Sequence, residues 1–123
     1  MAGSVLPTTW TPYRRAEDDE LLGYLDDAAD AAGVVPLTLF GVPLGPASSQ
    51  EEAQTTLERR GLASLAEPWL LRRANGDEVR VAVMAAFPDR VLVVPAPYGY
   101  ADPAERPVVV HAADGPALLR PYA

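Results

Sequence analysis

Alternating hydrophobic and polar residues are clearest in the second half of the chain. Residues 69–74 and 77–83 are strand-like runs separated by Asn75-Gly76, the dipeptide most typical of a two-residue type I′ hairpin turn. That loop length predicts a cross-strand register with these facing pairs: Arg73 with Glu78, and Leu71 with Arg80. Because another turn leads into the hydrophobic run 91–94, this region is predicted to form a three-stranded antiparallel meander.

A helix is predicted between residues 50 and 60. Ser49 and Glu52 have the spacing of a capping box, in which each side chain bonds the backbone N–H of the other residue. Gly61 is predicted to end this helix in the left-handed conformation. The segment before the helix, residues 41–48, contains two glycines and two prolines and is therefore predicted to be a connector.

Residues 21–32 fit two secondary structures. As a helix, the segment has an apolar stripe of leucine and alanine, acids in its first turn, and Gly33 after its end. As a strand, residues 21–25 form a short run that a loop connects to a second run at 34–40. Gly23 lowers helix stability by about 1 kcal/mol relative to alanine and fits a strand that has a close neighbour. We therefore favour a strand and a hairpin here.

The C-terminal third adds a loop rich in proline and tyrosine, residues 96–107, and a strand-like run at 108–111, with a weaker run at 117–119. Together the elements predict an α+β fold: a mostly antiparallel sheet of five to six strands with one main helix, in the order ββαβββ. The length fits one domain over residues 1–123. We expect residues 1–12 to form an extended or poorly ordered N-terminal arm.

The composition removes most of the side chains that enzymes use near neutral pH. The chain has no lysine and no cysteine, and His111 is its only histidine. This excludes lysine Schiff bases, thiolate nucleophiles and zinc–thiolate sites. Ser48 and Ser49 lie outside any Gly-x-Ser-x-Gly elbow, and their position before a helix indicates capping. We therefore expect a non-catalytic protein without a cofactor or metal ion.

The net charge of −7 is concentrated in one segment. Seven carboxylates lie within residues 17–30 with no arginine among them, and the remaining ten acids equal the ten arginines in number. Such a segment disfavours nucleic acid and attracts a cation or a basic protein surface. Its candidate binding residues are Asp26, Asp27 and Asp30. For the segment taken alone, a solvated acidic loop that only increases solubility is the favoured interpretation, because charge runs are commonly solubilising surface.

Tyr98 and Tyr100 are the second pair of candidate binding residues. They flank Gly99 in a loop, residues 97–103, that also contains two prolines. Rigid amphipathic rings of this kind are typical of binding loops, but aromatic rings more often simply pack, so the interpretation that these two cover one end of the core is favoured over an interface. The strand predicted near Val108 offers, if it lies at a sheet edge, backbone groups that could pair with a second copy of the chain.

Three functions fit these features. The favoured one is a non-catalytic protein-interaction module that binds a protein partner, basic where it meets the acids, through residues 17–30, the loop 97–103, or both. The alternative is a carboxylate-based site for a divalent cation or small ligand, although EF-hand spacing is absent; its candidate residues are Asp18, Asp19, Asp26, Asp27 and Asp30. The third is an acidic inhibitor that mimics nucleic acid. Because residues 1–11 carry no basic residue and no sustained apolar run, we expect a cytoplasmic protein without membrane association.

Overall fold

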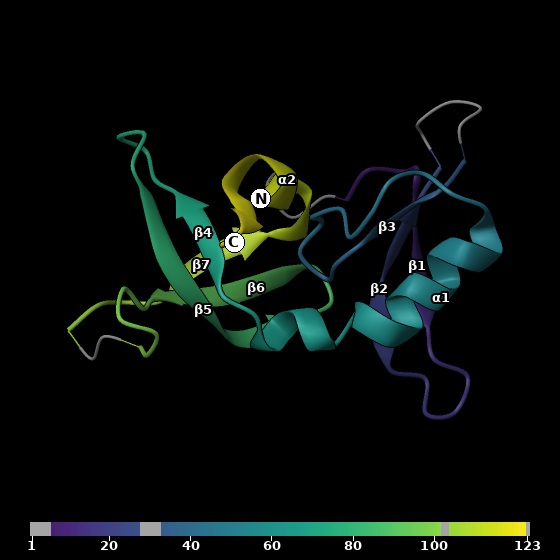
Figure 1. Cartoon of the computed structure of the whole chain (residues 1–123), viewed down its shortest axis with the longest axis horizontal. Coiled ribbons are helices and arrows are strands. Elements are labelled where there is room, and N and C mark those ends of the chain that lie inside the picture. Colours follow the sequence, from purple (N-terminus) through teal and green to yellow (C-terminus); the bar gives the residue numbers. More distant parts are fainter. Residues whose placement is uncertain (1–5, 28–32, 102–103, 123) are drawn as a thin grey trace.

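Two antiparallel sheets and one main helix form the fold in the computed structural model, which describes residues 6–27, 33–101 and 104–122 (Figure 1). The three-stranded sheet, in the order β1-β2-β3, consists of β1 (Trp10–Arg14), β2 (Leu21–Asp26) and β3 (Val35–Leu37). The five-stranded sheet, in the order β7-β6-β5-β4-β8, consists of β4 (Trp69–Arg72), β5 (Glu78–Phe87), β6 (Arg90–Pro95), β7 (Val108–His111) and β8 (Leu119–Pro121). The helices are α1 (Gln50–Arg60) and α2 (Gly115–Leu118), with 3-10 turns η2 (Ala63–Ala66) and η3 (Ala112–Asp114).

The predicted α+β class is confirmed, although the strands divide between two sheets instead of forming one. Strands β1 and β8 and the short helix α2 were not predicted. Strand β1 begins at Trp10 and pairs with β2, so residues 10–12 belong to a sheet and not to the N-terminal arm expected over residues 1–12. Residues 1–5 lie outside the described residues. The weak run at 117–119 becomes the end of α2 and the start of β8, which pairs with β4.

The three-stranded sheet lies between α1 and the five-stranded sheet. On one side, Leu22 and Leu25 pack with Ala53 and Leu57 of α1. On the other side, one hydrophobic core contains residues from both sheets: Leu21, Tyr24, Leu37, Leu39, Phe40, Val42, Trp69, Leu71, Val81, Val91, Val93, Val110 and Leu119. Because β2 is covered on both sides, residues 21–25 are all buried.

The choice of a strand over a helix for residues 21–25 is confirmed. The run is hydrophobic on both faces because the strand is central, and such a run does not show the alternation that identifies a half-buried strand. Gly23 has the close neighbours that its sequence context suggested. A Cβ atom there would lie 2.2 Å from the carbonyl oxygen of Leu37 and 2.9 Å from the side chain of Leu57.

The predicted capping box begins α1. The Ser49 hydroxyl accepts a hydrogen bond from the Glu52 N–H at 3.1 Å, and the Glu52 carboxylate accepts one from the Ser49 N–H at 3.3 Å. The prediction for Gly61 is wrong, because its φ of −55° is right-handed. Glycine is required there for space: a Cβ atom would lie 2.4 Å from the carbonyl oxygen of Leu22, where the helix end approaches β2.

The β4–β5 hairpin forms, but its turn is not type I′. Gly76 N–H donates to the Arg73 carbonyl at 2.9 Å and Arg73 N–H donates to the Asp77 carbonyl at 2.8 Å, so the loop has three residues. Gly76 has a φ of 91°, whereas Asn75 does not have positive φ. The Asn75 side chain accepts a hydrogen bond from the Asp77 N–H at 2.9 Å. This contact stabilises a type I turn followed by a glycine bulge, the usual three-residue alternative.

The extra loop residue shifts the hairpin register by one. The predicted pairing of Arg73 with Glu78 and of Leu71 with Arg80 is therefore wrong. The facing pairs are Arg72 with Glu78, Leu71 with Val79, Leu70 with Arg80, and Trp69 with Val81. Glu78 instead forms an ion pair with Arg120 of β8, at 2.6 Å. The continuation of the hairpin into β6 confirms the predicted meander.

Candidate functional site

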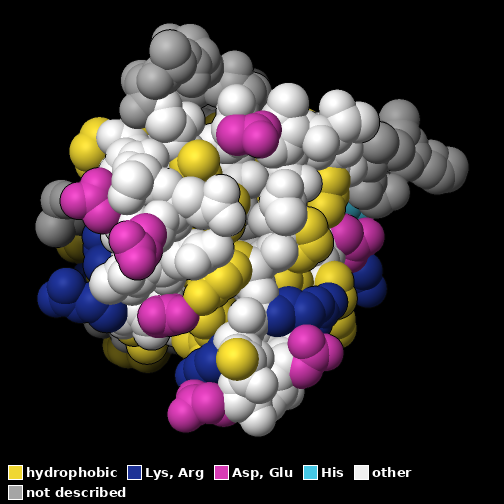
Figure 2. Space-filling view, turned by 90° about the vertical axis from the view of Figure 1, so that its right-hand side faces the viewer, with side chains coloured by type: hydrophobic (Ala, Val, Ile, Leu, Met, Phe, Trp, Pro, Cys, Tyr) yellow, Lys and Arg dark blue, Asp and Glu magenta, His cyan; other side chains and the backbone are white. Residues whose placement is uncertain are grey.

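The acidic segment 17–30 does not form one cluster. Glu17 to Glu20 lie in the loop before β2, whereas Asp26 ends β2 and Asp27 follows it. A strand rises about 3.3 Å per residue, which puts these two groups roughly 20 Å apart at opposite ends of β2 (Figure 1). Asp30 lies outside the described residues. On the face shown in Figure 2, acidic side chains and arginines are interspersed, and the acidic side chains do not form one continuous patch.

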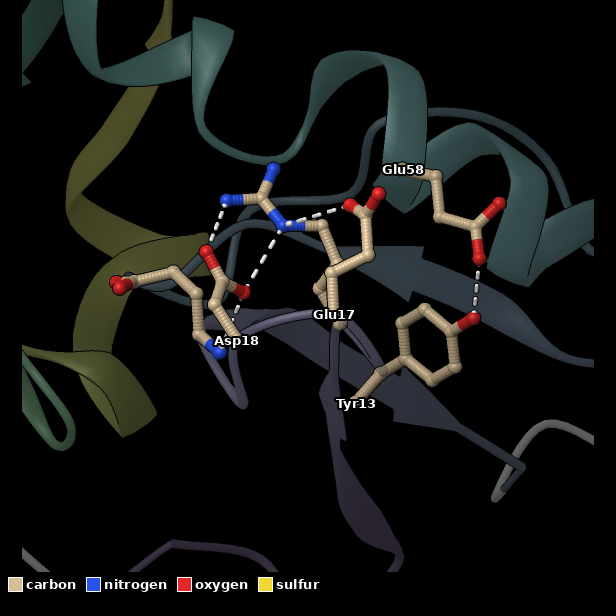
Figure 3. Close-up of polar contacts among 6 residues, drawn as sticks. Tyr13, Glu17, Asp18 and Glu58 are labelled. Carbon is tan, nitrogen blue, oxygen red and sulfur yellow. Dashed lines mark hydrogen bonds and ion pairs between the residues drawn. The ribbon is translucent and has the colours of Figure 1, made fainter.

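Arg15 holds the acids of the β1–β2 loop. Its guanidinium donates to both carboxylate oxygens of Asp18, at 3.0 Å from Nε and 2.7 Å from Nη2, and lies 3.8 Å from Glu17 (Figure 3). The Asp18 carboxylate also accepts a hydrogen bond from the Glu20 N–H at 3.1 Å. The hydrogen bond from Arg15 is the main cause that lowers the pKa of Asp18 to about 2. This end of the acidic segment is therefore partly neutralised by an arginine that precedes it in sequence.

We expect NMR titration of the Asp18 carboxyl to give a midpoint near 2, below its ordinary value of 3.8. Because the pKa is lowered in the folded loop, the contribution of this contact to loop order is complete above pH 3.8 and is lost as the pH falls through about 2. Arg15→Gln should return the midpoint toward 3.8. Arg14→Gln is the control, because Arg14 donates to the Asp19 carbonyl and not to the Asp18 carboxylate. A parent midpoint at 3.8 would contradict the contact.

Tyr13 connects the three-stranded sheet to α1 beside this loop. Its hydroxyl donates to the Glu58 carboxylate at 2.5 Å (Figure 3), and this hydrogen bond is the main cause that raises the pKa of Tyr13. The contact gives Glu58 a structural role in placing the helix.

Asp26 and Asp27, two of the predicted binding residues, lie at the far end of the three-stranded sheet. Asp26 faces Trp10 on one side and Val35 on the other, and Asp27 N–H donates to the Thr9 carbonyl at 3.4 Å. Within the described residues, no three histidine, aspartate or glutamate side chains are placed to share a metal ion. The described residues of the predicted cation site therefore do not converge as ligands of one ion.

The Tyr98–Tyr100 loop begins with a hydrogen-bonded turn. Gly99 N–H donates to the Ala96 carbonyl at 3.0 Å, and Ala96 N–H donates to the Arg80 carbonyl at 2.8 Å, which attaches the turn to β5. Pro97 occupies the second position of this turn, where its fixed φ is already suitable. The turn therefore presents Tyr98 on a constrained backbone.

The two rings project into solvent. Tyr98 is 79% exposed and Tyr100 is 64% exposed, with ring centroids 6.3 Å apart at 35°. The interpretation favoured from the sequence, in which the two rings cover one end of the core, is therefore wrong.

Arg80 and Tyr122 extend this surface. Neither residue was a candidate binding residue from the sequence. The Arg80 guanidinium lies 4.4 Å from the centre of the Tyr122 ring, and its Nη2 lies 3.7 Å from the position that a Cβ atom on Gly99 would occupy. Tyr122 reaches this place because β8 pairs with β4, a contact that no local pattern indicates. We call Tyr98, Tyr100, Tyr122 and Arg80 the aromatic surface.

A hollow of about 200 Å³ adjoins the aromatic surface. Its lining residues are Leu65, Ala66, Glu67, Pro68, Arg80, Val81, Ala82, Val83, Ala96 and Gly99. A second hollow, of about 190 Å³, lies where β2 approaches the β5–β6 turn, and Asp19 and Glu20 contribute to its wall. Both are smaller than the roughly 300–1,000 Å³ typical of small-molecule sites. Each can receive one or two side chains of a protein partner.

The strand predicted near Val108 is present as β7, at one edge of the five-stranded sheet, and His111 ends it.

Among the described residues, no helix is both long and apolar enough to cross a membrane. Comparisons with models of protein families, with characterised proteins and with solved structures give no match to this chain.

Proposed function

We propose that this protein is a non-catalytic interaction module that binds a protein partner through its aromatic surface. The observation that carries the proposal is the exposure of Tyr98 and Tyr100 on a hydrogen-bonded turn, beside a hollow and the stacked pair of Arg80 and Tyr122. Tyrosine and arginine are enriched among the residues that contribute most of the energy of protein interfaces.

The geometry lowers the conformational cost of binding. A tyrosine side chain has only two rotatable χ angles, and the turn at residues 96–99 already constrains the backbone that carries Tyr98. Less freedom is therefore lost when a partner covers the ring. Arg80 is also held in place by the Tyr122 ring, so its donors are directed before a partner arrives.

The acids have a secondary role in this proposal. Exposed charges act over a Debye length of about 8 Å at physiological salt, and they change association rates more than they change final affinity. The loop acids are partly neutralised by Arg15, and a strand separates them from Asp26 and Asp27. We therefore propose that these carboxylates attract a partner with a basic surface, and that the tyrosines anchor it. The cytoplasmic location expected from the sequence remains part of the proposal.

The test compares capture of a partner by variants of the tagged chain from native lysate at physiological salt. We expect Tyr98→Ala combined with Tyr100→Ala to weaken binding by about 30-fold or more, because one hot-spot residue contributes about 2 kcal/mol. The loss should be in the dissociation rate, since buried anchors control the lifetime of a complex.

Tyr13→Ala is the matched control, because it removes a tyrosine ring from the other sheet. Reversal of Asp26, Asp27 and Asp30 to arginine should slow association and leave dissociation nearly unchanged. The proposal would be overturned if the parent and the double tyrosine variant captured the partner equally and charge reversal abolished capture. That result would mean that the acidic residues form the interface.

A further inference from the structure

One edge strand differs from the others in lacking a proline. In the described part of the chain, the sheets end at β1, β3, β7 and β8. Proline lies within three of these strands, as Pro12 in β1, Pro36 in β3 and Pro121 in β8, whereas β7 is Val-Val-Val-His. Proline at an edge blocks pairing with another chain because it has no N–H to donate. Strand β7 has neither a proline nor a charged residue to block such pairing.

The free backbone groups of β7 belong to Val109 and His111. Ala112 N–H donates to the Asp89 carbonyl at 2.9 Å, and the β6–β7 register places Val110 opposite Val91. Along an antiparallel strand, the backbone N–H and C=O groups of successive residues point alternately toward the neighbouring strand on one side and toward the opposite side. Val108, Val110 and Ala112 therefore bond toward β6, and the backbone of Val109 and His111 faces away from the sheet. The Val109 side chain is 48% exposed.

We propose that β7 pairs antiparallel with β7 of a second copy of this chain, forming a twofold dimer with one continuous ten-stranded sheet. The pairing is isologous, as in most homodimers. A register centred on Val110 places Val109 of each copy opposite His111 of the other. In this register, the N–H and C=O groups of both residues find partners. Moving the centre to Val109 would place His111 opposite Pro107, whose nitrogen carries no hydrogen.

Charge complementarity favours the same register. With Val110 at the centre, Arg106 of one copy and Asp114 of the other lie at the same end of the paired strands, each just outside β7, since Asp114 ends η3, and the twofold axis repeats this arrangement. Both residues are exposed, and neither forms an ion pair within the described residues. The net charge of −7 on each copy opposes association. Arg106 and Asp114 therefore put opposite charges at each end of the shared edge, which favours antiparallel association of two copies.

The first experiment measures mass by sedimentation equilibrium over protein concentrations from about 1 μM to 1 mM, a range that spans weak to moderate affinities. The parent should approach twice its 13.1 kDa chain mass. Val109→Pro removes an outward donor without removing a bond to β6, so it should stay folded and weaken dimerisation at least tenfold. Val109→Thr keeps the donor and the branched shape, and it should dimerise within about twofold of the parent.

The second experiment tests the register by charge exchange. Arg106→Asp and Asp114→Arg should each weaken the dimer, and the double variant should restore it, because each end of the shared edge again carries opposite charges. Circular dichroism confirms that the variants are folded.

A parent that stays monomeric throughout the concentration range would overturn the inference. So would a dimer that is insensitive to Val109→Pro, or one that the double charge exchange fails to restore. The Tyr98→Ala and Tyr100→Ala variants should dimerise like the parent, so failure here is distinct from failure of the proposed partner interface.

Discussion

Replacing Trp69 with alanine should lower the free energy of unfolding by about 3–5 kcal/mol, the usual range for a large aromatic residue in a core. Trp69 is 1% exposed and forms an edge-to-face contact with Phe40, with ring centroids 4.9 Å apart. Its indole Nε1 donates to the Ser64 carbonyl at 2.9 Å. Because Phe40 follows β3 and Trp69 begins β4, this contact joins the segments that carry the two sheets. Its loss should remove a large part of the total stability of a domain this size.

Urea unfolding followed by far-ultraviolet circular dichroism measures this loss without depending on tryptophan fluorescence. Trp69→Phe is the control: it keeps an aromatic ring and most of the apolar volume and removes the hydrogen bond to Ser64, so it should lose about 1–3 kcal/mol. A loss below about 1 kcal/mol for the alanine variant would mean that the two sheets do not share the core described above.

Gly115→Ala should destabilise the fold by more than about 3 kcal/mol, beyond the usual range for overpacking. The added Cβ atom would lie 1.5 Å from the carbonyl oxygen of Phe40 and 2.7 Å from its carbonyl carbon. Gly115 has a φ of −54°, which alanine adopts without strain, so the whole effect is steric. Elsewhere in a helix this change would stabilise by about 0.5–1 kcal/mol. Here α2 would have to move away from the turn after β3.

Thermal unfolding measures this effect, with Gly45→Ala as the matched control. A Cβ atom on Gly45 would have no neighbour within 4 Å, and its φ is not positive. We expect the control to stay within about 0.5 kcal/mol of the parent, as surface substitutions usually do. Equal stability of the two variants would contradict the packing of α2 on Phe40.

The sequence predicted the elements whose determinants are local. The capping box at Ser49 and Glu52 involves residues three apart, so it is readable and correct. The hairpin was placed correctly, but its register was wrong by one residue. Asn75-Gly76 is compatible with a two-residue or a three-residue loop. The hydrogen bond from the Asp77 N–H to the Asn75 side chain favours the three-residue loop.

Features that depend on distant contacts were not predictable from local patterns. Gly61 looked like a left-handed helix end, yet its glycine is required by the approach of β2, which lies about 40 residues earlier in the chain. Strand β8 forms only because β4 offers an edge for it.

The same distinction applies to the site. The proline and glycine beside Tyr98 and Tyr100 did not decide between a core-covering and an exposed position, and the structure shows both rings exposed. The addition of Arg80 and Tyr122 depends on pairing across two strands. The acidic segment looked continuous because its residues are adjacent in sequence, but a buried strand separates its two ends.

The most direct test of the aromatic surface is site-specific photo-crosslinking in the native cell, with benzoylphenylalanine in place of Tyr98. The proposed function predicts a covalent adduct with another protein at this position, identified by mass spectrometry and distinct from an adduct of the chain with itself. The same photoreactive residue in place of Asp18, in the acidic loop, should give much less of that adduct. An adduct from position 18 with none from position 98 would contradict the account and assign the interface to the acidic loop.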